Sequence, residues 1–436
     1  MVKGNTKKIL VIGFALFAMF FGAGNLIFPP YLGFISGGKW GLAIAGFTVA
    51  DAGFGLLGII ALANFNGDII SLGSKVNKKF AIALSLAIIL CIGPFLAMPR
   101  TAATSYEIGV IPILGESFSK YLFSTLFFLV SILLTIRPNK VVDIVGKILT
   151  PALLISVGFL IIKGLVNPVG PIADNALVDG VLKSGIRDGY QTMDAMASCV
   201  FSLVVINEIK ALKLSGEKEE FKMTISSGIT AALCLALVYG GLAHLGATYS
   251  KNMYVPIDID NTELLVDITN RVLGRTGLYI IAIIVFLACL TTAIGLLSAT
   301  SSYFTNLFNG RFSYGQIVIV VAIVSGLISV LGVSEIIKIS APILEVIYPC
   351  VTTLIIIGLF EKWIKNDLVY KIPVLINLFL GLMAALIERG YLSSLSGIYK
   401  ALPMEVYGLY WVIPMILGVI VALLISKIKK PASKEA

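Results

Sequence analysis

Charge is scarce in this chain. Lys, Arg, Asp and Glu make up 13% of its 436 residues, whereas hydrophobic residues make up 58%. A typical soluble domain is about one quarter charged and about half apolar. This composition excludes an ordinary soluble protein and predicts a membrane protein that crosses the bilayer many times.

Residues that carry metal, redox or catalytic chemistry are also scarce. The chain has one histidine, His244, and five cysteines, none of them at the spacing of a metal site or a disulfide framework. It contains no Gly-x-x-x-x-Gly-Lys phosphate loop and no recognisable catalytic triad. These absences argue against an ATP-driven pump and an enzyme, and we expect no cofactor.

Long apolar runs dominate what remains. A helix needs about 20 apolar residues to cross a bilayer, and this criterion predicts an all-α integral membrane protein that forms a single domain over residues 1–436. Twelve spans are expected, at residues 9–35, 41–62, 80–99, 118–136, 141–162, 188–206, 222–245, 277–305, 316–331, 336–360, 372–387 and 405–426. The eleventh span is the least clear of these, because it is short and Glu388 and Arg389 close it.

The net charge of +9 does not indicate nucleic acid, because the basic residues follow the spans. Most of the 33 lysines and arginines fall on the side of the amino terminus, between alternate pairs of spans. Basic residues favour the cytoplasmic side of a membrane. We therefore expect both termini in the cytoplasm, a lipid bilayer as partner and no nucleic acid.

The first span contains a break. Gly22 and Gly24 weaken a helix, and Pro29 and Pro30 lack backbone donors. Unpaired backbone groups are tolerated at membrane depth only where they face protein or a water-filled cavity. There the freed groups can hold an ion or a zwitterion, as in transporters with broken helices. The alternative is a kink that serves only packing.

Two long connections, 163–188 and 246–276, fall at corresponding places if spans one to five and six to ten are inverted repeats. The first repeat is then 9–163, the second 188–360, and 372–426 adds two helices. This symmetry predicts a second break in span six. Residues 190–207 contain no glycine or proline, so a break near Asp194 to Ser198 is only weakly signalled.

Several charged residues lie inside spans, where a carboxylate costs about 2.5 to 3.5 kcal/mol. Asp194 either faces the site or is a satisfied structural group, and Asp51 is either a proton carrier or a structurally paired acid. Arg100 and Glu107, at the outer end of span three, are assigned to gating or interface anchoring. Glu345 has no defined role.

Four stretches resemble the signatures of the bacterial branched-chain amino-acid carrier family. They are Phe20 to Pro30, Gly93 to Ala102, Gly189 to Ala197 and Leu290 to Leu296. The resemblance implies a secondary transporter with the LeuT fold in the bacterial cell membrane, which imports leucine, isoleucine and valine with Na⁺ or H⁺. It says nothing of oligomeric state. A carrier of another small amino acid or solute with the same fold is the alternative, and a channel or receptor is a third class.

The amides near Gly22, Ala23, Gly24 and Asn25 are expected to bind the substrate carboxylate, because a helix start attracts anions. Asp194 and Ser198 are the other substrate candidates. Freed carbonyls at Ala18 and Phe21 can bind a cation, and the resemblance adds Thr291 and Thr292, which could instead only bond back to their own helix. Na⁺ is favoured, with proton coupling through Asp51 or Asp194 as the alternative.

Overall fold

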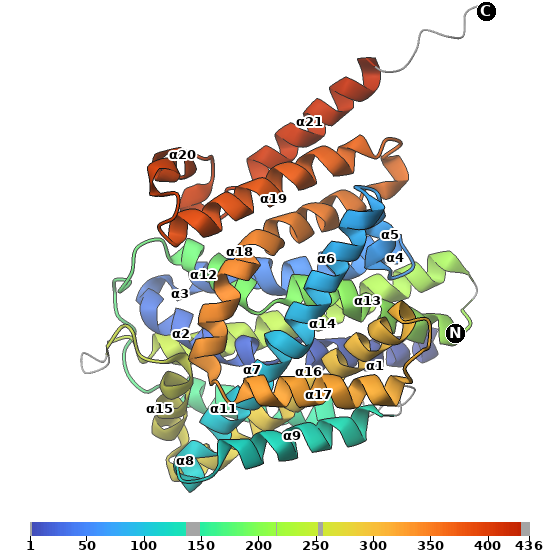
Figure 1. Cartoon of the computed structure of the whole chain (residues 1–436). Helices are drawn as coiled ribbons and strands as arrows, with labels where there is room; N and C mark the ends of the chain where they lie inside the picture. The colour runs from blue at the N-terminus through green and yellow to red at the C-terminus, as the bar shows by residue number, and fades with distance from the viewer. Residues whose placement is uncertain (1, 137–148, 215, 252–255, 429–436) are drawn as a thin grey trace, which may run out of the picture.

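The computed structural model describes residues 2–136, 149–214, 216–251 and 256–428, and within these ranges it contains helices and no strand (Figure 1). The helices are α1 Val2–Phe20, α2 Ala23–Ser36, α3 Trp40–Thr48, α4 Phe54–Ala63, α5 Ile69–Ser74, α6 Lys78–Leu90, α7 Ala97–Gly109, α8 Ile111–Leu114, α9 Lys120–Thr135, α11 Thr150–Val166, α12 Val181–Gln191, α13 Asp194–Ala211, α14 Glu217–Ala247, α15 Asn261–Leu273, α16 Arg275–Leu307, α17 Tyr314–Ser329, α18 Val333–Gly358, α19 Leu368–Glu388, α20 Ser396–Lys400 and α21 Val412–Ile428. Wider π-type turns, η2 Val49–Gly53 and η3 Cys91–Phe95, interrupt two of the apolar segments.

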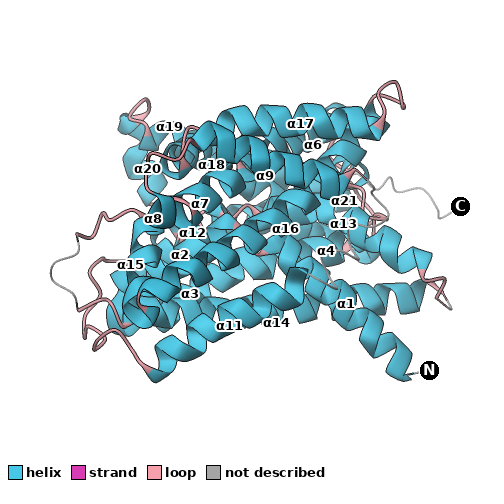
Figure 2. Cartoon of the chain, turned by 90° about the horizontal axis from the view of Figure 1, so that it is seen from below, coloured by secondary structure: helices cyan, strands magenta, loops and turns pink. Residues whose placement is uncertain are grey.

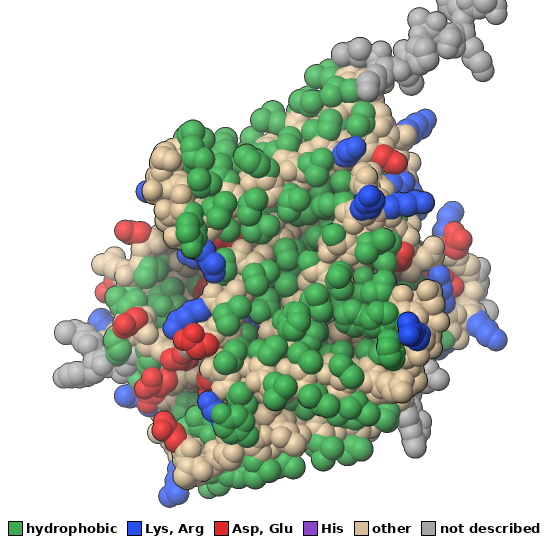
Figure 3. Space-filling view, in the orientation of Figure 1, with side chains coloured by type: hydrophobic (Ala, Val, Ile, Leu, Met, Phe, Trp, Pro, Cys, Tyr) green, Lys and Arg blue, Asp and Glu red, His purple; other side chains and the backbone are tan. Residues whose placement is uncertain are grey.

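Six segments of the described chain are long and apolar enough to cross a membrane. They are Ala23–Ala63, Lys78–Leu114, Glu217–Ala247, Arg275–Leu307, Val333–Gly358 and Leu368–Glu388. The bent pair of α12 and α13 adds a seventh, and four shorter apolar helices accompany them. The long helices run side by side, with loops gathered at the two ends of the bundle (Figure 2). Hydrophobic side chains cover the broad face between those ends (Figure 3).

The structure changes some of the predicted boundaries. The weak eleventh span is a full helix, α19, of 21 residues. The last span begins at Val412 instead of residue 405. The long connection 246–276 contains α15, whose start is stabilised because the Asp260 side chain accepts the amide of Thr262 at 2.8 Å. The beginning of the fifth predicted span, 141–162, lies outside the described residues.

Glycines allow a close crossing between α2 and α14. A Cβ on Gly33 would lie 1.9 Å from the carbonyl oxygen of Ala243, and one on Gly246 would lie 1.8 Å from that of Pro30. Any larger residue at either position would push the helices apart, as at small-residue crossings in membrane proteins generally. This contact fixes α2 against the core and so positions the first helix break.

The predicted break in the first span is confirmed. The helix stops at Phe20 and restarts at Ala23, leaving Phe21 and Gly22 between α1 and α2. A second break separates α12 from α13 at Thr192 and Met193, where the chain bends by 40°. It precedes the expected position near Asp194 to Ser198, which is regular helix. Both breaks expose backbone groups in the interior of the bundle.

Candidate functional site

The first break redirects one backbone amide. Gly22 donates its N–H to the side-chain oxygen of Asn25 at 3.2 Å, and regular bonding resumes where Leu26 donates to the Gly22 carbonyl at 3.2 Å. In a continuous helix the Gly22 amide would instead bond to the carbonyl of Ala18. The Asn25 side chain therefore releases the Ala18 carbonyl and leaves the first amides of α2 directed into the interior.

Two threonines of α16 meet the released carbonyl. The hydroxyl of Thr291 lies 2.9 Å from the Ala18 oxygen and that of Thr292 lies 3.4 Å from it. Thr291 also approaches the carbonyl of Ala288 in its own helix at 2.9 Å. The structure thus brings Ala18, Thr291 and Thr292 together, and it adds the Ala288 oxygen. Phe21 follows directly at the end of α1, where its amide still bonds to Phe17.

The second break is built without glycine. Met193 adopts a left-handed conformation with φ of 70°, which is unfavourable for a residue with a side chain. The Thr192 hydroxyl lies 2.6 Å from the carbonyl oxygen of Gly189 and 2.7 Å from a carboxyl oxygen of Asp51, and it can donate to either. Arg100, only 2% exposed, donates to the Gln191 carbonyl at 2.7 Å. Arg100 therefore stabilises the open end of α12. Because its side chain is buried, it does not anchor the membrane interface, which is one of its two predicted roles, and the other role, gating, stays a prediction.

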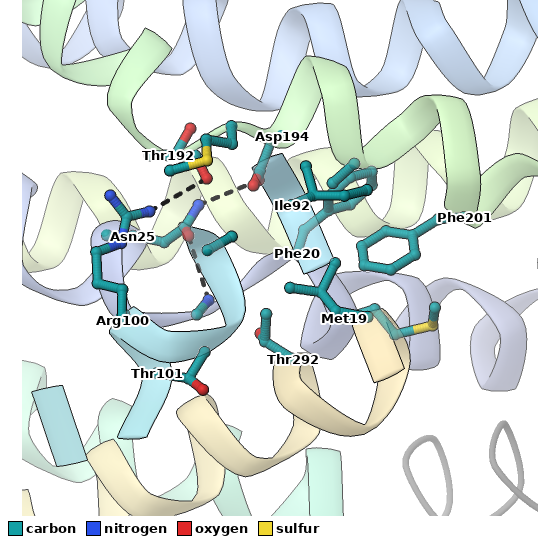
Figure 4. Close-up of a pocket in the computed structure, with 17 residues that line it drawn as sticks. Met19, Phe20, Asn25, Ile92, Arg100, Thr101, Thr192, Asp194, Phe201 and Thr292 are labelled. Carbon is teal, nitrogen blue, oxygen red and sulfur yellow. Dashed lines mark hydrogen bonds between the residues drawn. The ribbon is translucent and has the colours of Figure 1, made fainter. Parts of the chain in front are cut away.

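A polar network joins the two breaks (Figure 4). The side-chain amide nitrogen of Asn25 lies 3.2 Å from Asp51, 3.1 Å from Asp194 and 2.7 Å from the hydroxyl of Tyr239. The carboxyl groups of Asp51 and Asp194 thus lie against the same side-chain nitrogen. Both acids are buried, and Arg100 is the cation that faces Asp194. Two carboxyls against one guanidinium leave room for one more positive charge, either a proton or a cation.

A pocket lies between the breaks. Its lining consists of Met19, Phe20, Gly22, Ala23, Gly24, Asn25, Ile92, Ala97, Arg100, Thr101, Thr192, Met193, Asp194, Ala197, Phe201, Thr292 and Leu296. The space is narrow, with a volume of only about 20 Å³. That volume holds about one water molecule, so a larger solute requires side chains to move apart.

The pocket contains most of the predicted substrate residues. Gly22, Ala23, Gly24, Asn25 and Asp194 line it together. Ser198 does not, because its hydroxyl donates to the Ala195 carbonyl at 2.6 Å on the side of α13 that packs against α4.

Other lining residues were not anticipated. Arg100, Thr101 and Thr192 are polar, and Phe20, Ile92 and Phe201 supply an apolar wall. The role of Arg100 could have been predicted from the sequence, because this charged residue follows the Gly93-Pro94 and Pro99 interruptions in an otherwise apolar segment. The role of the apolar residues could not, because many equivalent side chains occur along the same helices.

Comparison with known proteins agrees with this architecture. The family model described as "Branched-chain amino acid transport protein" matches residues 5–429. The chain belongs to this family. It is 36% identical over 437 residues to the branched-chain amino acid permease BrnQ of Bacillus subtilis, covering 97% of this chain and 98% of that protein. A putative branched-chain amino acid carrier protein of Staphylococcus haemolyticus is 35% identical, with the same coverage.

The family and these relatives are transport proteins and not enzymes, which confirms the expected class and the resemblance found in the sequence. Multi-pass transport proteins of this kind fit a bacterial plasma membrane.

Solved transporters share the fold. The chain superposes with a TM-score of 0.61 on a Na⁺-coupled sialic acid symporter, at 18% identity and covering 98% of this chain and 91% of that one. The score is 0.59 for Mhp1, a nucleobase-cation-symport-1 family transporter, at 13% identity and coverage of 96% and 90%. It is 0.57 for MhsT in complex with L-phenylalanine, at 15% identity and coverage of 95% and 98%. At these identities the likeness describes the fold alone.

Proposed function

We propose that the chain is a secondary symporter that imports leucine, isoleucine and valine across the bacterial plasma membrane by alternating access, coupled to Na⁺. The observation that carries the proposal is the pocket between two helix breaks, which combines free helix-start amides, a buried carboxyl and an apolar wall. A branched-chain amino acid has a carboxylate, an ammonium group and an apolar branch. Each part of the substrate finds a matching surface in the pocket.

Each group of the substrate has a proposed partner. The amides of Ala23 and Gly24 at the start of α2 suit the carboxylate, because a helix start carries positive potential. Asp194 suits the ammonium group, and Phe20, Ile92 and Phe201 suit the branched side chain. The narrowness of the pocket fits a closed form of the carrier, which must open to one side of the membrane to admit or release the substrate.

The packing supports two inverted repeats, 9–163 and 188–360, with 372–426 as an addition. The halves of the first broken helix, α1 and α2, both pack along α14. The halves of the second, α12 and α13, pack along α3 and α4. Each broken helix thus lies along the second span of the other repeat, as a two-fold relation requires. We propose twelve spans in one domain, with both termini in the cytoplasm.

For the coupling ion, we propose Na⁺ between the Ala18 carbonyl and the hydroxyls of Thr291 and Thr292. Oxygen dipoles at a broken helix replace the hydration shell of such an ion. A fold relative named as a Na⁺-coupled symporter supports this choice. The acid pair of Asp51 and Asp194 supports the alternative, in which a proton is the coupling ion.

The test is uptake by purified protein reconstituted in liposomes. Radiolabelled leucine should accumulate under an inward Na⁺ gradient, with isoleucine and valine as competitors and alanine as a weak one. A proton gradient without Na⁺ should drive little uptake. If none of the three branched-chain amino acids is transported under either gradient, the proposed function is wrong, and preferential alanine uptake would indicate a carrier of other small amino acids.

A further inference from the structure

A second cavity lies beside the first half of the second broken helix. Four tyrosines line it, Tyr190 from α12, Tyr348 from α18, and Tyr399 and Tyr410 from the connection between α19 and α21. We call it the tyrosine cavity. The volume of the tyrosine cavity is about 50 Å³, compared with about 20 Å³ for the central pocket. The tyrosine cavity is therefore the larger of the two. Part of its wall comes from α19 and from the connection between α19 and α21, which lie outside the two proposed repeats.

The charges around the tyrosine cavity do not balance. Lys183 is paired with Glu405 at 2.5 Å, and Arg187 is paired with Glu388 at 3.3 Å. Glu345 also lines the cavity and forms no ion pair within the described part of the chain. Glu388 lines the same cavity. Two carboxylates that share one cavity repel each other, so one further cation beside Glu345 would stabilise the arrangement.

The aromatic rings indicate what kind of cation fits. The ring centroids of Tyr190 and Tyr348 are 4.2 Å apart with the rings tilted by 31°, and those of Tyr399 and Tyr410 are 5.3 Å apart in an edge-on arrangement. The faces of aromatic rings attract organic ammonium groups, whereas a small inorganic ion prefers a shell of oxygen ligands. Several rings around one surplus carboxylate therefore suit an ammonium group better than Na⁺.

The tyrosine cavity adjoins the central pocket through α12. Gln191 belongs to the cavity lining, and its backbone carbonyl accepts from Arg100, which lines the central pocket. The two spaces therefore share one wall. A solute held in the tyrosine cavity would lie next to the break that shapes the central site.

We propose that the tyrosine cavity is a second binding site for a free amino acid, whose ammonium group lies between Glu345 and the tyrosine rings. This inference rests on the proposed function, because it takes the transported amino acid as the ligand. It goes further in assigning a binding role to Glu345 and to the connection between α19 and α21.

The test is equilibrium binding of radiolabelled L-leucine to the purified full chain in Na⁺ buffer, from micromolar to millimolar ligand. We expect two leucines per protein in the unmodified chain and one in Glu345→Gln. Gly24→Leu, which fills the central pocket, should also bind one, and the double variant none. Glu335→Gln is the matched control, since this acid of the same helix lies on the surface with Lys338, and it should bind two.

Competition in the Gly24→Leu protein identifies the group that is recognised. Isopentylamine, which is leucine without its carboxylate, should displace the remaining leucine, whereas 4-methylpentanoate, which lacks the amine, should not. Displacement by Na⁺ but not by the amine would indicate an inorganic cation site and overturn the assignment. A single leucine in the unmodified chain, with Glu345→Gln unchanged, would overturn the second site and leave the proposed function intact. Absence of any leucine binding would overturn both.

Tyr399→Leu gives a check that is independent of charge. It removes one ring from the tyrosine cavity but no ionisable carboxyl, and it should weaken leucine binding in the Gly24→Leu background at least threefold. Unchanged affinity in this variant, with the protein folded and monodisperse, would contradict the aromatic part of the site.

Discussion

The two helix breaks reach similar geometry by different means. At the first break the unusual residues are local, since Gly22 forms the interruption and Asn25, three residues later, accepts its amide. At the second break the chain uses Met193 in a left-handed conformation. That break is held by Arg100 and Asp51, which are distant in sequence. One break is encoded in its own segment, and the other depends on the assembled bundle.

The energies are consistent with this difference. A left-handed conformation costs a residue with a side chain about 1–2 kcal/mol. A hydrogen bond from a charged donor contributes about 1.5–3 kcal/mol, so the Arg100 bond to the Gln191 carbonyl is sufficient to offset that cost. The second break should therefore fail when distant residues change, whereas the first should persist and fail only when its own space is filled.

The largest effect should come from filling the first break. In Gly24→Leu, the new Cβ would lie 3.1 Å from a terminal nitrogen of Arg100 and 3.4 Å from the Thr192 backbone, and the rest of the side chain would occupy the central pocket. We expect leucine uptake in proteoliposomes to fall below detection while the protein still inserts. Gly158→Leu is the control, because a Cβ there meets nothing within 4 Å. Normal uptake affinity in Gly24→Leu would show that the break is only a packing kink.

The second largest effect should come from Arg100. Arg100→Met removes the donor at the end of α12 and leaves Asp194 without its facing cation. The bond from the charged guanidinium to the Gln191 carbonyl contributes about 1.5–3 kcal/mol, and Asp194 also loses the cation that faces it, so we expect the initial rate of leucine uptake to fall about 100-fold.

Arg100→Lys separates charge from geometry. Lysine keeps the positive charge but lacks the planar fork with which arginine reaches the carbonyls of both Gln191 and Thr192, so it should restore only part of the rate. Arg389→Gln, at an exposed position after α19, should transport normally. If Arg100→Met keeps more than half of the normal rate in equal amounts of folded protein, the second break does not depend on this clamp.

The same contrast explains what could be predicted from the sequence. The first break was legible because Gly22, Gly24, Pro29 and Pro30 act on their own backbone. The second was misplaced because Met193 carries no local signal, and the bonds that hold it come from α7 and η2. Ser198 was assigned to the site by proximity to that misplaced break. The all-helical, apolar architecture could be predicted, since each helix needs only its own composition, whereas the wall of Phe20, Ile92 and Phe201 depends on tertiary packing.

The smallest effect that still separates the two breaks concerns ion coupling. The hydroxyls of Thr291 and Thr292 meet the carbonyl released at the first break, so Thr291→Val with Thr292→Val should raise the Na⁺ concentration for half-maximal uptake at least tenfold, which corresponds to about 1.4 kcal/mol. Thr300→Val in the same helix is the control, because its hydroxyl has no partner among the described residues. Asp51→Asn, which acts at the second break, should leave the Na⁺ dependence nearly unchanged. If the double valine variant keeps normal Na⁺ dependence while Asp51→Asn abolishes the response to an imposed pH gradient, coupling runs through a proton held by the acid pair and not through Na⁺ at the first break.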